Sequence, residues 1–276
     1  MSRAARVETA RGPVFAKWAR GPAADTYGAE ADGLALLRAT ADRAGAGAGV
    51  VVPEPLAVVP QTDGWAGLVL PWIEPARPSP SDWQRAGAGL AALHRVDAGA
   101  DYGLDGDNWI GSKPQRNGRL GSWPRFFGEQ RLLAQAETVR RLARDGAGQR
   151  GAWDGAWDAP LARLVARLPE LLPETPPRSV VHGDLWAGNA MGTGGGQVAL
   201  IDPAAYVGHR EVDLAMTELF GGFPAAFYDG YQEAWALEPG YPERREVYNL
   251  FHLINHLTHG ASYRQPVQAT LRRFGT

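Results

Sequence analysis

The chain of 276 residues contains no cysteine. Without thiols it can form no disulfide, no thiolate metal site and no cysteine nucleophile. It also lacks an excess of charge, because 28 Lys and Arg residues stand against 30 Asp and Glu residues. Proteins that bind nucleic acids or anionic membrane surfaces usually carry a basic excess. The composition therefore predicts neither of these partners.

Long apolar runs are missing as well. No stretch approaches the length of a membrane span, and the opening sequence MSRAARVETARG has no apolar centre typical of a secretion signal. Together with the absence of cysteine, this favours a cytoplasmic protein. Hydrophobic residues make up 45% of the chain and charged residues 21%, which is typical of a folded globular protein.

Lysine is almost absent too. Lys17 and Lys113 are the only lysines among the 28 basic residues. Any chemistry that requires a lysine therefore has two candidates in this chain.

The first 71 residues alternate short apolar strands with one helix. Residue spacing predicts a hairpin of 6–9 and 14–18, a helix over 30–43, and a second hairpin of 56–59 and 65–70. The proline-rich segment 71–78 then marks the best domain boundary. We expect a nucleotide-binding domain over 1–71, a hinge over 72–78, and a catalytic and substrate domain over 79–276.

The rest of the chain is mostly helical. Helices are predicted over 81–96 with Ser81 as cap, over 123–144 and over 160–172, and again from residue 211 onward. A small β segment lies over 179–202. The fold class is therefore predicted as α+β, with two lobes of which the first is rich in strands.

The segment HGDLWAGN over 182–189, followed by LID over 200–202, carries the strongest chemical signal. Asp184 and Asn189 are five residues apart, and Asp202 lies thirteen residues further on. This spacing is typical of phosphoryl-transfer kinases. One carboxylate there accepts the proton of the attacking hydroxyl, while an amide and a second carboxylate supply the hard oxygen ligands that Mg²⁺ prefers. His182 is predicted to brace the loop, as is Asp213 from a helix N-terminus.

A kinase also needs a cation close to the nucleotide phosphates. Lys17 ends an apolar strand, and Glu30 opens the next helix thirteen residues later. This is the strand-lysine and helix-glutamate pair of a kinase small lobe. Lys113 is the competing lysine, for contact with substrate or for a place on the surface.

Several longer segments resemble the fructosamine kinase family, within the larger group that includes aminoglycoside phosphotransferases and choline kinases. The HGDLWAGN and GHREVDLAM segments are more specific than the kinase triad itself. The matching segments cover nearly the whole chain and comprise 14–17, 102–104, 108–112, 114–117, 182–189, 202–204, 206, 208–216, 218–223 and 248–256.

This resemblance implies a bilobal protein kinase-like fold that uses ATP and Mg²⁺. Asp184 would be the catalytic base, Asn189 and Asp202 the Mg²⁺ ligands, and Lys17 with Glu30 the phosphate clamp. The connector Pro71, Trp72 and Ile73 would bind adenine through its backbone. Pro71 has no N–H but keeps its carbonyl acceptor, and Ile73 can donate.

For the acceptor, the resemblance implies a ketosamine, free or attached to a protein, phosphorylated on its 3-hydroxyl in deglycation repair. Trp186 lies between the expected base and Asn189, so we expect its ring to form a wall of the acceptor site. His209 and Arg210 are further candidates for substrate contact, although Arg210 could instead pair with Glu211.

Two alternatives stay open. An aminoglycoside or other amino-alcohol kinase would use the same nucleotide machinery, but the few acids over 242–276 weakly disfavour a polycationic substrate. The second alternative is not an enzyme but a pseudokinase, which binds nucleotide without catalysing a reaction. It gains support from the start of the chain, where the family's first strand and glycine-containing turn are expected to be missing. The sequence does not indicate an oligomeric state.

Overall fold

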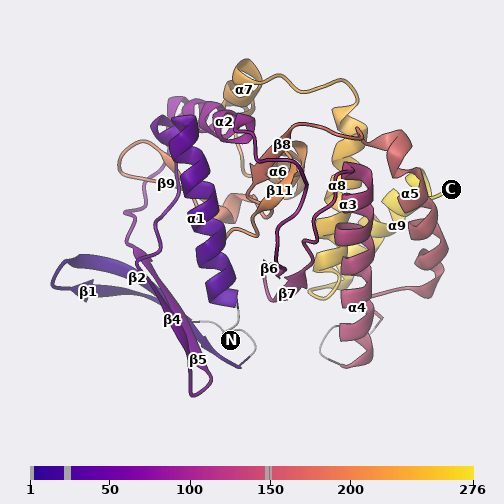
Figure 1. Ribbon diagram of the computed structural model, residues 1–276, viewed down its shortest axis with the longest axis horizontal. Coiled ribbons are helices and arrows are strands. Elements are labelled where there is room, and N and C mark those ends of the chain that lie inside the picture. The colour runs from indigo at the N-terminus through magenta and orange to yellow at the C-terminus, as the bar shows by residue number, and fades with distance from the viewer. Residues whose placement is uncertain (1–2, 22–25, 147–148, 150) are drawn as a thin grey trace.

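A four-stranded antiparallel sheet forms one end of the molecule (Figure 1). In this computed structural model the described residues are 3–21, 26–146, 149 and 151–276. The strand order is β1-β2-β5-β4, with β1 over Arg3–Thr9, β2 over Gly12–Arg20, β5 over Trp65–Pro71 and β4 over Ala57–Thr62. Both predicted hairpins are confirmed.

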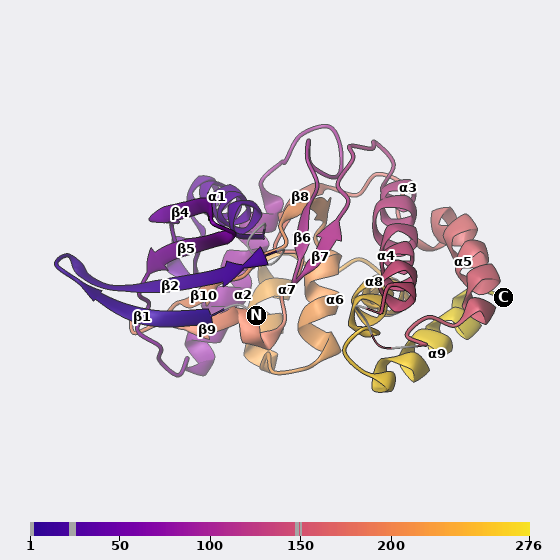
Figure 2. The ribbon, with the colours of Figure 1, turned by 90° about the horizontal axis from the view of Figure 1, so that it is seen from below.

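Helix α1 (Thr26–Ala44) lies beside the large sheet and runs from there toward the helix that begins at Pro80 (Figures 1 and 2). Leu34 and Leu37 lie one turn apart and are fully buried. The helix is therefore held by an apolar stripe, as its sequence period predicts. Glu30 lies in its second turn and faces strand β2, where Lys17 pairs with Leu68 of β5.

Three smaller sheets lie between the large sheet and the C-terminal helices. Strand β3 (Val50–Val51) runs parallel to β10 (Val198–Leu200), which also pairs with β9 (Ala190–Gly192). The other two pairs are β8 (Arg178–Val181) with β11 (Tyr206–His209), and β6 (Asn108–Ile110) with β7 (Lys113–Gln115). Neither β11 nor the β6–β7 hairpin was expected from the sequence, because these strands are too short to show a clear period.

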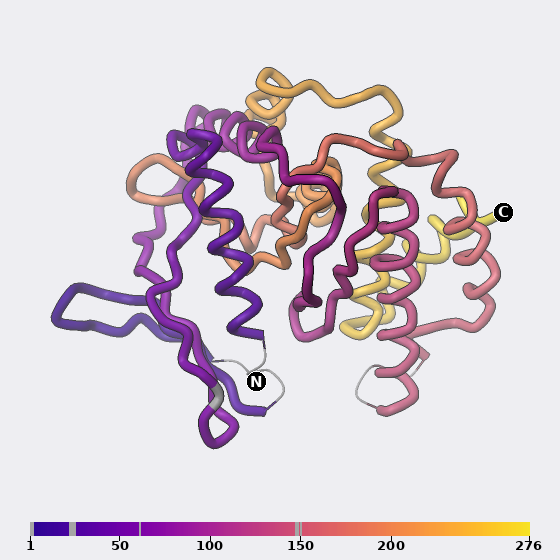
Figure 3. Tube along the Cα trace, in the orientation of Figure 1, coloured from indigo at the N-terminus to yellow at the C-terminus, as the bar shows by residue number. Residues whose placement is uncertain are grey.

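Helices α2 (Pro80–Arg95) and α7 (Ala225–Ala234) pack against each other beside the end of α1, and α6 (Glu211–Leu219) lies in the middle of the molecule (Figure 1). The other helices gather at the end of the molecule where the C-terminus lies (Figure 3). They are α3 (Trp123–Phe126), α4 (Ala134–Arg144), α5 (Asp158–Leu171), α8 (Tyr241–His256) and α9 (Arg264–Phe274). A π-helical stretch, Phe127–Leu133, joins α3 to α4. In the part of the chain that the structure describes, no helix has the length and apolar character needed to cross a bilayer.

The cap of α2 is Ser79 and not Ser81. Ser79 accepts a hydrogen bond from the Asp82 backbone, while the Asp82 carboxylate accepts from the Ser79 backbone at 2.7 Å. This reciprocal capping box satisfies two free helix N–H groups, whereas Ser81 lies inside the first turn. The helix itself is where the sequence predicts it.

The hydrophobic core crosses the segment predicted as a hinge. One cluster joins Leu34 of α1 and Leu68 of β5 to Leu90 of α2, Val198 of β10 and Phe227 of α7. A second cluster lies among the C-terminal helices around Trp123 and Tyr248. Because the first cluster draws on both sides of residues 72–78, burial of apolar surface ties the sheet to the segments that carry the chemical motifs.

Helices α2 and α7 approach each other at two glycines. A Cβ on Gly87 would lie 1.9 Å from the Phe227 carbonyl oxygen, and one on Gly230 would lie 2.0 Å from the Gln84 carbonyl oxygen. Contacts that short are impossible, so the two backbones can pack at this distance only without side chains. The contact matters for the site because Tyr231 of α7 and His94 of α2 meet beside it.

We expect Gly87→Ala to lower the free energy of unfolding by about 1–3 kcal/mol, because the added methyl must push the two helices apart. Urea denaturation followed by circular dichroism measures the change. Gly28→Ala is the matched control, since Gly28 is exposed on α1 and its Cβ would meet nothing within 4 Å. That variant should be neutral or stabilising by up to about 1 kcal/mol. Equal destabilisation of both variants would contradict the close-packing explanation.

Candidate functional site

The segment 182–189 forms a loop between β8 and β9, in the middle of the molecule. Gly183 has φ of +79°, and a Cβ there would lie 2.2 Å from the Ala204 carbonyl oxygen. Only glycine fits such a position. The close approach brings the loop against the segment that follows Asp202, so that Asp184, Asn189 and Asp202 converge as their spacing predicts.

Asp213, the third residue of α6, holds this loop in place. Its carboxylate accepts hydrogen bonds from the backbone N–H groups of His182 at 2.6 Å and Gly183 at 2.8 Å. His94 of α2 lies 3.2 Å from the same carboxylate and 2.9 Å from the Tyr231 hydroxyl. Burial alone would raise the pKa of Asp213, but hydrogen bonding and charge from His94 outweigh it and the pKa is lowered. The bracing role predicted for Asp213 is confirmed.

His182 also supports the loop and does not face solvent. Its Nε2 lies 2.9 Å from the Ile201 carbonyl oxygen, the residue before Asp202. Burial lowers the pKa of His182, although the charge of Asp213 opposes the shift. A neutral imidazole in this place links the two ends of the site, as the sequence predicts.

The carboxylate of Asp184 lies at the bottom of the site, with 21% of its side chain exposed. Burial raises its pKa to about 7, with further contributions from the charges of Asp202 and Asp213, while Lys113 opposes the shift. His252 Nδ1 lies 3.9 Å from Asp184 Oδ1. A carboxylate with a pKa near neutrality is suited to accept a proton from a hydroxyl.

Asn189 and Asp202 present oxygen atoms on the other side of the loop. The Asn189 Nδ2 donates to the Asp184 carbonyl at 2.9 Å and approaches the Asp202 carbonyl at 3.4 Å. The amide nitrogen is thereby committed to the protein, which leaves Oδ1 as the group that can bind a ligand. Asp202 has φ of +53°, a conformation that few non-glycine residues adopt and that is often found at functional sites.

Lys17 connects the large sheet to this loop. Its Nζ lies 2.5 Å from Glu30 Oε2 and 2.6 Å from Asp202 Oδ1. Burial would lower the pKa of Lys17, but the charges of the two carboxylates outweigh it and the pKa is raised. For Asp202, burial would raise the pKa, but the charge of Lys17 lowers it overall. Burial raises the pKa of Glu30 to about 7, against the opposing charge of Lys17. Strand β2, helix α1 and the segment after β10 thus meet in one cluster of titratable side chains.

An apolar pocket of about 200 Å³ lies beside this cluster, at the end of β5. The predicted connector residues Pro71, Trp72 and Ile73 all line it, and Asp202 forms its inner end. The sequence patterns do not single out the other residues that line the pocket. Three of them, however, lie within two residues of Lys17, Asn189 or Asp202. The other lining residues are Phe15, two residues before Lys17 on the same strand, Met191, two residues after Asn189, Ile201, which precedes Asp202, and Pro53, Leu70 and Pro75.

Trp186 follows Asp184 by two residues and is 42% exposed. Its indole lies over Gly188, where a Cβ would come within 2.3 Å of the ring. Two buried polar side chains from other elements lie close to Asp184. His252 Nδ1 of α8 is 3.9 Å from its carboxylate, and the charge of Lys113 of β7 acts on its pKa. Asn249 lies one turn before His252 on α8 and is also buried. The sequence offers Lys113 as a candidate but indicates no role for Asn249.

His209 and Arg210 do not lie in this cleft, which corrects their assignment to substrate contact. His209 is buried with its Nδ1 2.8 Å from the Tyr248 hydroxyl. Arg210 donates to the carbonyls of Trp235 at 2.9 Å and Ala236 at 2.6 Å, with its guanidinium 3.9 Å from the Trp235 ring centre. Protein groups therefore satisfy both side chains. Glu211 pairs with Arg244 and not with Arg210.

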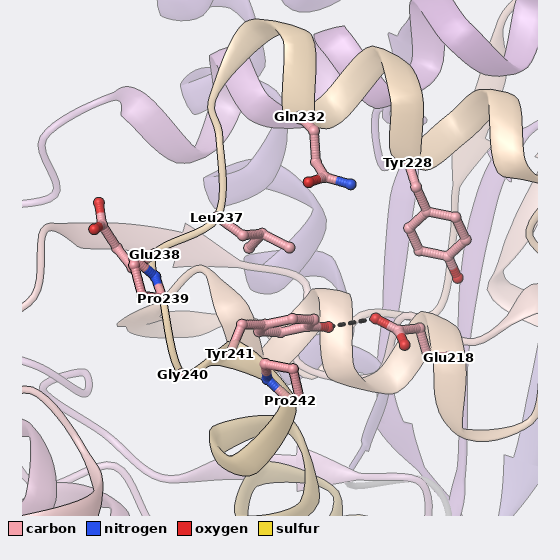
Figure 4. Close-up of a pocket in the computed structure, with 9 residues that line it drawn as sticks. All are labelled: Glu218, Tyr228, Gln232, Leu237, Glu238, Pro239, Gly240, Tyr241 and Pro242. Carbon is pink, nitrogen blue, oxygen red and sulfur yellow. Dashed lines mark hydrogen bonds between the residues drawn. The ribbon is translucent and has the colours of Figure 1, made fainter.

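A second hollow lies between α6, α7 and the start of α8 (Figure 4). It contains none of the residues discussed above. The Tyr241 hydroxyl donates to Glu218 Oε1 at 2.6 Å, and Tyr228 lies 3.2 Å from Thr217 Oγ1. Because these polar groups have partners within the protein, the hollow shows no set of free groups that would select a ligand.

Comparison with known proteins gives consistent results. The model of the family described as fructosamine kinase matches residues 1–275. A Synechocystis protein assigned as a ketoamine kinase is 40% identical over 248 residues, which cover 90% of this chain and 78% of that protein. The crystal structure of a protein from Haemophilus somnus assigned as a fructosamine-3-kinase superposes with a TM-score of 0.84 at 28% identity, covering 99% of this chain and 88% of the other.

A more distant structure shares the fold alone. It is an aminoglycoside phosphotransferase in a ternary complex with AMP-PNP and hygromycin B. It superposes with a TM-score of 0.61 at 15% identity and covers 98% of this chain and 90% of the other. The predicted kinase-like α+β fold is confirmed by both structural comparisons.

We expect Asp213→Ala to lower the free energy of unfolding by about 2–5 kcal/mol, since it leaves two buried backbone N–H groups and His94 without their acceptor. Denaturant titration provides the measurement. Asp229→Ala is the matched control, because Asp229 is exposed on α7. Its effect should stay within about 0.5 kcal/mol. If the two variants differ by less than that, Asp213 does not brace the loop.

Proposed function

The chain belongs to the fructosamine kinase family, and we propose that it transfers the γ-phosphoryl group of ATP to the 3-hydroxyl of a ketosamine. Membership of this family makes it an ATP-dependent phosphotransferase that acts on ketosamines. The observation that carries the proposal is the placement of Asp184 between two different surroundings. The Lys17–Asp202 cluster and the apolar pocket are proposed to hold the nucleotide. His252 and Lys113 close to Asp184, together with the exposed Trp186, are proposed to face the acceptor.

On the acceptor side, Asp184 is proposed as the base. The attacking hydroxyl must lose its proton as the new P–O bond forms, and a carboxylate with a raised pKa accepts it more readily than an ordinary aspartate does. The backbone around Asp184 is fixed by Asp213. The base is therefore held at a constant position relative to the phosphate groups, and positioning is a large part of catalysis of phosphoryl transfer.

On the nucleotide side, the apolar pocket is proposed to hold adenine. Its walls include Phe15, Met191 and Ile201, and its edge is the connector. Pro71 offers only a carbonyl acceptor there, and Ile73 can supply an N–H donor, which matches the donor and acceptor edge of adenine. Lys17, fixed by Glu30, would then contact the phosphates.

The oxygen atoms of Asn189 and Asp202 fit a magnesium ion. Both are hard ligands, and Mg²⁺ is usually bound through one or two protein groups together with substrate phosphates. No group of three or more His, Cys, Asp or Glu side chains suited to a metal occurs among the described residues, so a site without phosphates is not indicated. When bound, Mg²⁺ neutralises the charge of the phosphate oxygens.

The proposed product explains a role in repair. A phosphate on carbon 3 of a ketosamine stands next to the carbonyl at carbon 2, where it is a good leaving group. Loss of a proton from carbon 1 gives an enol between carbons 1 and 2, which expels inorganic phosphate from carbon 3. Water then hydrolyses the resulting imine and releases the original amine together with a dicarbonyl sugar fragment. The reaction therefore reverses glycation of the amine.

An assay panel tests the proposed substrate class. ATP consumption is measured with ribulosamines, erythrulosamines, fructosamines and aminoglycosides, with the free amines and free sugars as blanks. We expect phosphorylation of at least one ketosamine, and ³¹P and ¹³C NMR should place the phosphate on carbon 3. Turnover with aminoglycosides alone would overturn the proposal. Absence of turnover with bound ATP would favour a pseudokinase.

Asp184→Asn should leave ATP affinity nearly unchanged and lower kcat by roughly 10² or more, since general-base assistance contributes about 10²–10⁴ in rate. The variant keeps the shape of the side chain but cannot accept the proton. Steady-state kinetics and calorimetric titration with ATP measure the two effects. If kcat stays within a few fold of the wild type for every accepted ketosamine, Asp184 is not the base.

Trp186→Ala should raise the ketosamine KM or lower kcat by about tenfold, because the acceptor loses a rigid wall and in-line attack depends on its position. The KM for ATP should change little. Trp65→Ala is the matched control, since Trp65 is similarly exposed but lies on β5 at the far end of the sheet. A loss of ATP affinity with unchanged ketosamine kinetics would show that Trp186 borders the nucleotide and not the acceptor.

A further inference from the structure

The acceptor side of the site contains an ammonium group with no partner. The residue Lys113 is only 4% exposed, and its Nζ, which keeps some access to solvent, makes no hydrogen bond and no ion pair with the residues that the structure describes. The other lysine, Lys17, has two carboxylates within 2.6 Å. Burying a cation without a counterion is unfavourable, so a group of this kind needs an explanation.

The β6–β7 hairpin determines where this lysine lies. Lys113 pairs with Ile110, and it shares one face of β7 with Gln115, two residues later. Gln115 donates to the Ala204 carbonyl at 3.0 Å, and Asn108 donates to the Ala205 carbonyl at 2.8 Å. The hairpin is thus fastened to the segment just after Asp202, between α1 and the C-terminal helices (Figure 1).

The charge of Lys113 affects the pKa of several neighbouring groups, which indicates where its amine lies. Lys113 opposes the raised pKa of Asp184, and it contributes to the lowered pKa of His256 and of His259, for which burial is the main cause. The main charges acting on Asp202 are instead those of Lys17 and His182. The amine therefore lies within reach of Asp184 and of the end of α8, on the face of β7 that also carries Gln115.

The surroundings of Lys113 offer no fixed counterion. Burial lowers the pKa of His252 to about 3, with His256 adding to the effect, so the nearby histidine is neutral at neutral pH. Burial also lowers the pKa of Lys113, to about 8, against the opposing charge of Asp184, so the amine remains mostly protonated. Asp184 makes no ion pair with it and is needed free for the incoming hydroxyl. His252 Nδ1, which lies 3.9 Å from Asp184 Oδ1, is a buried atom without a hydrogen-bond partner.

We propose that Lys113 binds an anionic group of the acceptor, so that this enzyme prefers ketosamines that carry a negative charge close to the reacting sugar. The inference rests on the proposed function and refines its substrate class. The charge can be the carboxylate of an amino acid whose amine is glycated, or a phosphate at the far end of the sugar. Either anion would give the buried ammonium the partner that the protein does not provide.

The proposal also separates acceptors by charge. Polycationic aminoglycosides would place like charge beside Lys113, which is unfavourable. A glycated lysine inside a protein has no free carboxylate close to its sugar, because its own carboxyl group is part of the main chain. Adducts of free amino acids are therefore expected to be better substrates than glycated proteins, unless the sugar itself carries a phosphate.

Kinetics with matched acceptors test this preference. The first pair consists of the ribulosamines of glycine and of glycinamide, which differ in the carboxylate alone. The second pair consists of ribulosamines of glycinamide with and without a phosphate on carbon 5 of the sugar. Each is assayed with the wild type, with Lys113→Met, which keeps the length of the side chain, and with Arg116→Met. Arg116 is the matched control, because it is exposed and lies on the opposite face of the same hairpin.

The wild type should favour the charged member of at least one pair by about tenfold in kcat/KM, the size of one charge-assisted contact. Lys113→Met should abolish that preference through the KM for the charged acceptor and change the neutral acceptors by less than about threefold, while Arg116→Met should keep it. The pair that shows the preference identifies the carboxylate or the phosphate as the anion.

Three results would overturn the inference. The wild type could phosphorylate ketosamines with no preference for charge, which would leave the proposed function intact. Lys113→Met could keep the charged-to-neutral ratio of kcat/KM while it raises the KM for ATP, which would assign the ammonium to the phosphate groups of the nucleotide. A variant with unchanged kinetics throughout would make Lys113 a structural residue. Absence of turnover with any ketosamine would instead count against the proposed function.

Discussion

The carboxylate of Asp213 is the contact on which the geometry of the site depends. It is buried at the start of α6 and accepts the backbone N–H groups of His182 and Gly183, so it fixes the loop directly before Asp184. His94 from α2 and, through it, Tyr231 from α7 hold the carboxylate in turn. Because α2 and α7 can meet closely at Gly87 and Gly230, a helix contact outside the site helps to position the catalytic loop.

Two carboxylates of one site are thereby given different properties. Asp202 is paired with Lys17 and has a lowered pKa, which suits a permanently ionised group beside a cation. Asp184 has no ion-pair partner of that kind, and burial raises its pKa to about 7, which suits a proton acceptor. Environments that move the pKa values of neighbouring acids apart are typical of sites that divide acid and base roles. The pKa values of the two carboxylates differ here because Lys17 of β2 pairs with Asp202 and not with Asp184.

The two lysines of the chain have different surroundings. Lys17 is enclosed by Glu30 and Asp202, so its charge is already balanced and can be shared with phosphates. Lys113 is buried in the residues around Asp184 without such partners. All other basic residues of the chain are arginine. The two lysines are therefore proposed to bind different molecules, Lys17 the nucleotide and Lys113 the acceptor.

The sequence by itself determined the local features of this protein. Neighbouring residues set the spacing of Asp184, Asn189 and Asp202, the two hairpins of the sheet, the strand lysine and the proline-rich segment 71–78. These features could therefore be predicted without a structure. Tertiary structure decided what depends on contacts between distant segments. It placed His209 and Arg210 in the core, brought the unexpected β6–β7 hairpin against the segment just after Asp202, and buried Lys113. The physical reason is that burial and charge pairing are set by whichever segments pack together, and no residue type or local spacing specifies those partners.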